Sequence, residues 1–343
     1  MRRLLNTLYV LTEDAYLSLE NENIVVTFAE GAVKRFPLQM LEQILFFGYK
    51  GASPALMGAC AKLGIGLCFY RPNGRFLARV SGNHYGNVLL RKEQYRVSDD
   101  KDTSCQFARC FIAGKIYNAR SVFERARRDH ALSIDIGPLV QASADMLSIA
   151  RQARVCADLD VLRGLEGEAA SIYFGNFDSL VLHNKTVFSF SGRVKRPPTD
   201  PVNAMLSFAY TLLANDCASA LEGVGLDPYV GFLHRDRPGR VSLALDLMEE
   251  LRSPFADRFV LTLINNRMIN SMSFTIQENG SVLLSEDARK KFLNAWQERK
   301  KDIVTHPFLE EKLPWGLIPF VQAQLLARCL RGDLEEYPAF LWK

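Results

Sequence analysis

The sequence predicts an α+β protein in which a β-rich N-terminal domain precedes a mostly α-helical domain. Residues 1–95 contain short, partly alternating runs of β-forming residues, such as TLYVLTE and NIVVTFAE, separated by polar turn residues. From Cys105 onward, long stretches have the apolar spacing of amphipathic helices. The polar residues 96–104, RVSDDKDTS, lack apolar periodicity. We therefore expect a β-rich domain at 1–95, a linker at 96–104 and a helical domain at 105–343.

Length and composition are those of a soluble globular protein. The 343 residues suffice for two domains, and 48% are hydrophobic and 23% charged. No apolar run approaches the roughly 18 residues that a transmembrane helix needs. Met1-Arg2-Arg3 leads into a strand pattern instead of a signal peptide, so we expect a cytoplasmic protein. The 42 Lys and Arg exceed the 38 Asp and Glu by four, a surplus that many enzymes share and that does not by itself indicate nucleic-acid binding.

The cysteines predict neither a disulfide framework nor a zinc knuckle. There are seven, and none forms a C-x-x-C pair, since the closest two, Cys105 and Cys110, have four residues between them. We interpret them as small buried apolar residues.

The N-terminal region carries clear turn and cap signals. Ser53-Pro54 predicts the start of a helix that runs through Lys62, and Gly64 predicts its end. Asn73-Gly74 predicts a hairpin between LCFYRP and GRFLARV. His84 lies in a Gly/Asn-rich turn, where a surface role is the simpler interpretation.

A basic helix opens the second domain. The segment GKIYNARSVFERARRDH, at 114–130, has five Lys and Arg residues against Glu124 and Asp129. It is either an ordinary solvated face or a surface that follows DNA phosphates, because lysine and arginine supply the sequence-independent part of DNA affinity. Its candidate DNA-binding residues are Lys115 and Arg120.

The segment LRGLEGEAASIY, at 162–173, places a glutamate on an apolar stripe. Glu166 shares its helix face with Leu162, Ala169 and Tyr173, whereas Glu168 points away. An unpaired buried carboxylate costs several kcal/mol, so Glu166 must be protonated, paired with an arginine or bound to a cation. The stripe alone does not decide between an arginine salt bridge and a metal.

Basic residues follow in a region without acidic ones. Between Asp178 and Asp200 there is no Asp or Glu, and a Pro-Pro corner follows a basic group suited to hold a phosphodiester: Arg193, Lys195 and Arg196. Asp200-Pro201 predicts the N-cap and first residue of a helix. On that helix Asn203, Ser207 and Tyr210 share one face, either as a core hydrogen-bond network or as an edge facing substrate.

A histidine on a loop and an acidic helix come next, in LHRDRPGRVSLALDLMEELRSP at 233–254. The helix from Ser242 gathers apolar residues on one arc and Asp246, Glu249 and Glu250 on the other, which taken alone is a solvated acidic face. His234 lies ahead of this helix, and three candidate DNA-binding residues stand between them: Arg235, Arg237 and Arg240. An imidazole with carboxylates and no thiolate suits Mg²⁺ or Mn²⁺ better than structural zinc.

The order and spacing of these segments resemble those of one known family over nearly the whole chain. The segments are Leu165-Glu166-Gly167 with Ala169, Ala170 and Tyr173, then RVKRPPTDPVNAMLSFAYTLL at 193–213, GLDPYVGFLH ending at His234, and SLALDLMEELR. They resemble the CRISPR-associated integrases, which are the larger, catalytic subunits of spacer-acquisition complexes. The C-terminal pattern resembles the subtype, type I-C-like, whose operon also encodes an iron–sulfur nuclease.

The resemblance implies a site and a reaction. Glu166, His234 and an acid of the following helix would hold Mg²⁺ or Mn²⁺. Glu249 matches the family's usual third ligand; Asp246 would be a second ligand or a support for the ligands, and Glu250 would be solvated or ion-paired. The 3′-hydroxyl of a foreign DNA fragment would attack a phosphodiester at the end of a CRISPR repeat by transesterification, without a covalent protein intermediate.

The resemblance also implies partners: DNA, a second copy of the chain bound through the β-rich domain, a small ferredoxin-like adaptation protein and the iron–sulfur nuclease. The C-terminal segment could dock a partner, although packing on its own domain is the simpler interpretation. Two alternatives stay open. A stand-alone metal-dependent nuclease for branched or damaged DNA would use the same ligands, and a non-catalytic DNA-binding scaffold would tolerate loss of Glu166 and His234.

Overall fold

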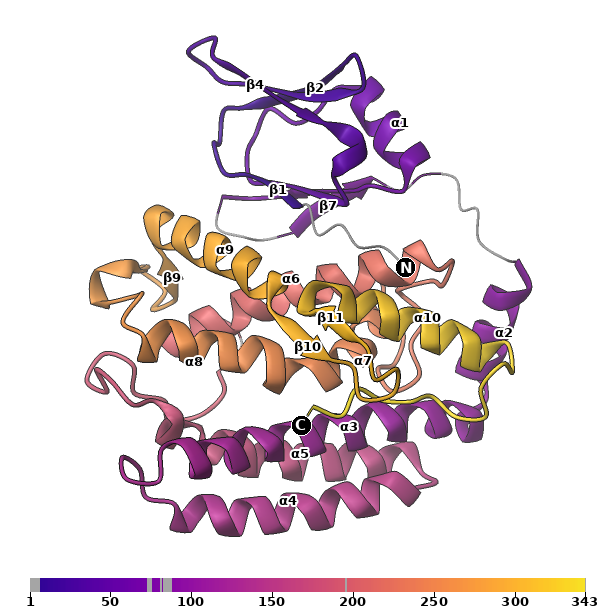
Figure 1. Cartoon of the computed structure of the whole chain (residues 1–343), viewed down its shortest axis with the longest axis vertical. Helices are drawn as coiled ribbons and strands as arrows, with labels where there is room; N and C mark the ends of the chain where they lie inside the picture. Colours follow the sequence, from indigo (N-terminus) through magenta and orange to yellow (C-terminus); the bar gives the residue numbers. More distant parts are fainter. Residues whose placement is uncertain (1–6, 73–75, 81, 83–87, 195, 343) are drawn as a thin grey trace. The chain divides into compact units, whose positions relative to one another are not determined.

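The computed structural model describes residues 7–72, 76–80, 82, 88–194 and 196–342 of the chain. It divides into two units. One unit comprises residues 1–85 and 289–302, and the other 86–288 and 303–343. The first is rich in strands and the second is mostly helical, which confirms the predicted α+β class (Figure 1).

The β-rich unit contains two sheets. A four-stranded sheet has the order β1-β5-β6-β7, in which β1, β5 and β6 are parallel and β7 is antiparallel to β6. A three-stranded antiparallel sheet has the order β2-β3-β4. The bounds are β1 Thr7–Val10, β2 Tyr16–Glu20, β3 Asn23–Thr27, β4 Val33–Pro37, β5 Gln43–Phe46, β6 Gly66–Tyr70 and β7 Phe76–Val80.

Turn and cap residues mark the ends of several strands and helices in this unit. Asn21 and Glu22 have φ of 46° and 61°, as a tight turn between twisted strands requires, and they join β2 to β3. Helix α1, Pro54–Leu63, begins as predicted, because Ser53 Oγ accepts a hydrogen bond from the backbone N–H of Leu56 at 3.2 Å. The first run, TLYVLTE, does not form a hairpin with the run that follows it, since β1 pairs in parallel with β5. The predicted turn at 73–74 and His84 lie outside the described residues.

Helix α9, Glu286–Lys301, contributes most of its length to the same unit. From its many charged residues alone, this segment would be interpreted as surface. Trp296 and Lys300 are instead 1% and 5% exposed, so that interpretation is wrong for the helix face that carries them.

The helical unit is built around the 29-residue helix α3, which packs against α4, α5 and α7. Helix α6 packs against α7 and α10. The helices are α2 Val88–Asp99, α3 Lys101–Asp129, α4 Gly137–Val155, α5 Leu159–Gly175, α6 Pro201–Gly223, α7 Ser242–Leu251, a π-helical turn Arg252–Asp257, α8 Arg258–Asn265 and α10 Ile318–Leu330. Two short antiparallel strand pairs complete the unit: β8 Phe274–Ile276 with β9 Val282–Leu284, and β10 Ile303–Thr305 with β11 Lys312–Pro314. Within the described residues, no helix combines the length and apolar character needed to cross a bilayer.

The predicted linker at 96–104 is wrong, because two helices meet there. Helix α2 runs to Asp99, and Asp100 caps α3 by accepting a hydrogen bond from the backbone N–H of Thr103 at 2.9 Å. Buried Ser104 donates to the Val97 carbonyl at 2.7 Å and ties the two helices together. These nine polar residues form the end of one helix and the start of the next. Polar side chains satisfy the free backbone groups at such helix ends, so the segment shows no apolar periodicity.

Candidate metal centre

The carboxylates of Glu166 and Glu249 meet at a single ammonium group. Glu166 lies on α5, Glu249 on α7 and Lys115 on α3. Lys115 Nζ is 2.7 Å from Glu249 Oε2 and also donates to Glu166 Oε1. Since one nitrogen contacts both, the two oxygens lie within roughly 6 Å of each other, twice the length of one hydrogen bond. Acids from two separate segments therefore converge on one cationic point, which in this structure is a lysine ammonium.

Glu249 is buried and doubly paired. Its side chain is 5% exposed, and Arg252 Nη1 donates to its two oxygens at 2.9 and 3.1 Å. Burial favours the protonated acid, but the nearby charges of Arg252, Lys115 and His234 outweigh it and hold the pKa of Glu249 far below its ordinary value. Glu249 is therefore ionised at neutral pH.

Asp246 organises the loop that carries His234. It is 0% exposed, and its Oδ2 accepts the backbone N–H groups of Phe232 and Leu233 at 2.6 and 3.0 Å. Its Oδ1 accepts the backbone N–H of His234 at 3.1 Å and lies 2.5 Å from His234 Nδ1. A Cβ at Gly231 would lie 2.8 Å from Asp246 Oδ2, so only glycine fits there. With four such contacts, Asp246 holds the loop and the ring of His234 in place, and whether it also binds a metal stays a prediction.

His234 is oriented by this carboxylate. When Nδ1–H donates to Asp246, Nε2 keeps the lone pair with which neutral histidine binds metals. Burial disfavours the imidazolium, but Asp246 and then Glu249 raise the pKa of His234 above its ordinary value. His234 also borders a polar cavity of about 540 Å³, whose lining includes Lys101, Arg163 and Arg235.

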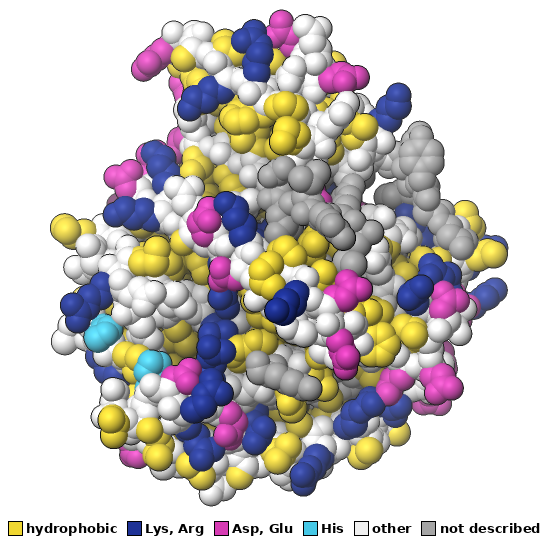
Figure 2. Space-filling model, viewed as in Figure 1, with side chains coloured by type: hydrophobic (Ala, Val, Ile, Leu, Met, Phe, Trp, Pro, Cys, Tyr) yellow, Lys and Arg dark blue, Asp and Glu magenta, His cyan; other side chains and the backbone are white. Residues whose placement is uncertain are grey.

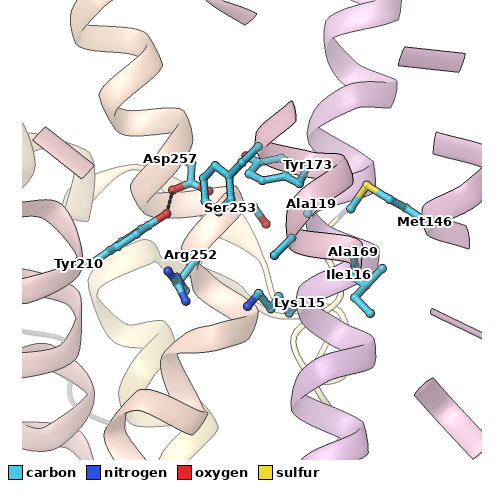
Figure 3. Close-up of a pocket in the computed structure, with 12 residues that line it drawn as sticks. Lys115, Ile116, Ala119, Met146, Ala169, Tyr173, Tyr210, Arg252, Ser253 and Asp257 are labelled. Carbon is cyan, nitrogen blue, oxygen red and sulfur yellow. Dashed lines mark hydrogen bonds between the residues drawn. The ribbon is translucent and has the colours of Figure 1, made fainter. Parts of the chain in front are cut away.

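Arg252 is fixed by aromatic and acidic neighbours on the other side of Glu249. Its guanidinium lies 4.3 Å from the centroid of the Tyr210 ring, and the Tyr210 hydroxyl donates to Asp257 Oδ1 at 2.5 Å. Figure 3 shows Lys115 extending from α3 toward the helix that carries Arg252, whose guanidinium lies on the side of Tyr210. Burial raises the pKa of Asp257 to about 6 although Tyr210 and Arg252 lower it.

The polar stripe on α6 is a core network. Asn203 and Ser207 accept hydrogen bonds from Arg193 at 2.7 and 3.0 Å, and Asp200 caps the helix through the Asn203 backbone N–H at 2.8 Å, as predicted. Arg193 Cζ lies 5.3 Å from the Tyr210 ring centroid. Arg193 therefore braces α6, while the alternative of a substrate-facing edge finds no support in these contacts.

Glu250 is buried, so the expectation that it would be solvated or ion-paired is wrong. It is 0% exposed and accepts hydrogen bonds from the Tyr337 hydroxyl at 2.5 Å, Gln322 Nε2 at 2.9 Å and the Phe340 backbone N–H at 2.6 Å. Burial raises the pKa of Glu250 to about 7 against the effect of these donors. The C-terminal segment thus packs on its own unit, beside the helix that carries Glu249.

The remaining DNA-binding candidates are spread over different environments. Arg235 is exposed and 3.2 Å from Asp160, Arg120 lies 3.4 Å from Glu124, and Arg240 donates to Ser242 Oγ at 3.3 Å. Arg196 and Arg237 are exposed, and Lys195 lies outside the described residues. On the face shown in Figure 2, basic and acidic side chains are interspersed. Their role toward DNA stays a prediction.

The donor set fits a hard divalent cation once one group moves. As the side chains stand, no three His, Cys, Asp or Glu residues in the described part of the chain are grouped so that they could hold a metal ion. The ammonium of Lys115 lies between Glu166 and Glu249. Two carboxylates and an imidazole nitrogen oriented by a carboxylate are a suitable ligand set for Mg²⁺ or Mn²⁺.

Sequence reasoning missed the roles of Lys115 and Arg252. A signal existed for each: Lys115 lies on the apolar face of α3 with Phe111, Ala119 and Val122, as Glu166 does on its own helix, and Arg252 follows Glu249 at the i+3 spacing of helical ion pairs. A lysine and a glutamate that each lie on the apolar face of a different helix predict each other as partners.

Comparison with known proteins gives consistent matches over the whole chain. A family model described as "CRISPR associated protein Cas1" matches residues 8–298. The chain is similar to CRISPR-associated endonuclease Cas1 2 of Rhodospirillum rubrum, with 50% identity, and to CRISPR-associated endonuclease Cas1 1 of Chlorobaculum tepidum, with 46% identity; each alignment covers 100% of both chains. It is also 35% identical to a Cas4 exonuclease/Cas1 endonuclease fusion of Geobacter sulfurreducens, over 97% of this chain and 60% of the fusion.

Solved structures share the fold. A casposase bound to its integration product superposes with a TM-score of 0.83 at 22% identity, covering 98% of this chain and 94% of that one. A Cas6-RT-Cas1–Cas2 complex superposes with a TM-score of 0.79 at 22% identity, covering 98% of this chain and 36% of that one.

Proposed function

Because this chain belongs to the CRISPR-associated Cas1 family, and is therefore an endonuclease and integrase of CRISPR adaptation, we propose that it joins 3′-hydroxyl DNA ends to repeats at a divalent-metal site formed by Glu166, His234 and Glu249. The observation that carries this proposal is the convergence of Glu166 and Glu249 on one cationic point, with His234 held by Asp246, which lies one turn before Glu249 on α7.

The chain's own residues have separate tasks in this proposal. Glu166, Glu249 and His234 Nε2 would hold Mg²⁺ or Mn²⁺, which when bound neutralises a phosphodiester and activates the attacking hydroxyl. Asp246 keeps the proton on Nδ1 of His234. Arg252 keeps Glu249 ionised and in place. The exposed Arg196, Arg235 and Arg237 supply positive charge for the DNA backbone.

Partners follow from the family. We propose a homodimer built through the β-rich unit, together with the small ferredoxin-like adaptation protein. The proposal of an iron–sulfur nuclease partner, in a type I-C-like system, draws support from the fused Cas4 exonuclease in the Geobacter relative. The stand-alone nuclease is not favoured, since family membership and the matching relatives point to adaptation.

A joining assay tests the proposed function. The protein is incubated with and without the small partner, together with short 3′-hydroxyl duplexes, a supercoiled plasmid carrying a repeat array, and Mn²⁺ or Mg²⁺. We expect joined product that requires the metal and is lost on adding EDTA. Cleavage without joining in every condition would instead support the stand-alone nuclease.

Replacing Asp246 by asparagine should weaken metal binding without removing a ligand. The amide would present its NH₂ either to the backbone N–H groups that hold the loop or to Nδ1 of His234, so either the loop or the imidazole ring loses an acceptor that orients it. Loss of such a supporting carboxylate typically costs about 10- to 100-fold in metal affinity. Mn²⁺ titration calorimetry of Asp246→Asn measures this, with Asp236→Asn, an exposed acid on the same loop, as control. Equal Mn²⁺ affinity in Asp246→Asn and wild type would contradict the support role.

Metal binding should weaken on acidification, because a protonated imidazole cannot coordinate. Asp246 and Glu249 raise the pKa of His234 against burial, so the proton competes with the metal from a pH above the ordinary histidine range. The affinity for the metal is therefore highest where His234 is neutral, and it falls as the pH decreases through the raised pKa of His234. Mn²⁺ affinity measured across that range should show this decline, and His234→Ala should bind weakly with a flatter profile. A wild-type affinity that is constant down to pH 5 would contradict the assignment.

A further inference from the structure

We propose that Lys115 is a resident counter-ion of the metal centre, which holds Glu166 and Glu249 together before the divalent cation binds and is displaced by it. This inference rests on the proposed function, because it takes the two carboxylates as the cation's ligands. It assigns Lys115 a positioning role toward the metal in place of the DNA contact expected from the sequence.

The position of Lys115 carries the argument. Its ammonium is 2.7 Å from Glu249 Oε2 and also contacts Glu166 Oε1, so it touches the oxygens that the cation requires. The Lys115 side chain is 14% exposed and that of Glu249 5%, so solvent screens this pair weakly, whereas the Glu166 side chain is 30% exposed. An ammonium and a divalent cation repel one another and cannot share one point between the same oxygens.

Lys115, and not Arg252, is the group able to move. Arg252 is pinned by two contacts with Glu249 and by stacking on Tyr210 at 4.3 Å. Lysine carries a compact charge on a flexible four-carbon stem, whereas a stacked guanidinium is held by its plane. Displacement of Lys115 leaves Arg252 as the remaining positive neighbour of Glu249.

Two opposite effects of neutralising Lys115 follow. Without metal, the two carboxylates lose their shared ammonium and repel each other, so the metal-free protein becomes less stable. With metal, the cation no longer competes with a positive charge, so it binds more tightly. A residue with a merely structural role would lower stability without raising metal affinity.

The experiment titrates Mn²⁺ into the full chain without DNA, by calorimetry and by thermal unfolding. The variant is Lys115→Met, and Lys115→Gln serves as a second neutral variant that still donates hydrogen bonds. The matched control is Lys185→Met, which removes the same charge from an exposed pair with Asp178. Glu166→Gln identifies binding at the site itself.

We expect both neutral variants at Lys115 to bind Mn²⁺ about tenfold more tightly than wild type. We also expect a larger rise in unfolding temperature on adding Mn²⁺, while Lys185→Met matches wild type in both. Mn²⁺ binding that requires Glu166 but is unchanged or weakened in Lys115→Met and Lys115→Gln overturns this inference alone. Absence of Glu166-dependent Mn²⁺ binding in wild type overturns the proposed function, and this inference with it.

Discussion

Glu166→Ala is expected to reduce DNA joining by at least about a thousandfold, because a catalytic metal ion supplies several kcal/mol of transition-state stabilisation. Glu166 extends from α5 toward the same cationic point as Glu249 on α7. Without it, one side of the proposed site has no anionic ligand, and Lys115 pairs with Glu249 alone. Single-turnover joining of a labelled 3′-hydroxyl duplex to a repeat-bearing plasmid measures the loss.

Glu168→Ala is the matched control for this prediction. Glu168 lies two residues away on α5, and its side chain is exposed. Both substitutions remove one carboxylate from the same helix, so a general effect of charge or helix stability would affect them equally. Joining by Glu168→Ala should stay within about twofold of wild type, since surface substitutions are usually nearly neutral. A Glu166→Ala protein that retains a tenth or more of wild-type joining would contradict the metal role of Glu166.

Tyr337→Ala is expected to destabilise the helical unit by about 3–5 kcal/mol, as is usual when a large buried aromatic side chain is truncated. Tyr337 is 3% exposed, and its ring centroid lies 4.9 Å from that of Phe111 on α3. Its hydroxyl donates to Glu250 Oε1 and accepts from Gln322 Nε2 at 2.6 Å. The truncation therefore leaves a cavity and removes a donor from a buried carboxylate.

A series of variants separates these two contributions. Tyr337→Phe keeps the ring but leaves Glu250 short of one donor, which should cost about 1–3 kcal/mol. Leu341→Ala, in the same C-terminal segment but 38% exposed, should cost less than about 1 kcal/mol. Urea unfolding of each variant gives the changes in the free energy of unfolding. Equal stability of Tyr337→Ala and Leu341→Ala would show that the buried network around Glu250 does not hold the segment in place.

The sequence predicted those parts of the site that depend on local patterns. Asp200 followed by proline is a cap signal within one turn, and the Glu166 stripe is a periodicity within one helix. Asp200 has its hydrogen-bond partner three residues away, and the helix face of Glu166 follows from the apolar residues within one helix. The resemblance to the family added the assignment of His234 and Glu249 as metal ligands, which periodicity alone did not decide.

The missed parts depend on residues far apart in the chain. Glu250 was assigned to a solvated face because its helix has an acidic arc, but that arc is covered by the C-terminal segment, 72 to 90 residues further along. Lys115 was assigned to DNA for its charge, whereas its partners lie on two other helices. Pattern analysis gives the face on which a side chain lies but not what covers that face, so buried charge pairs between helices stay hidden from it.

The most direct test of the metal centre is a crystal structure of the protein with Mn²⁺, with anomalous scattering used to locate the ion. We expect an anomalous peak coordinated by Glu166, Glu249 and His234 Nε2, with His234 Nδ1 still hydrogen-bonded to Asp246 and the Lys115 ammonium withdrawn from both carboxylates. A structure at saturating Mn²⁺ in which Lys115 still bridges Glu166 and Glu249, with the ion bound elsewhere, would contradict this expectation.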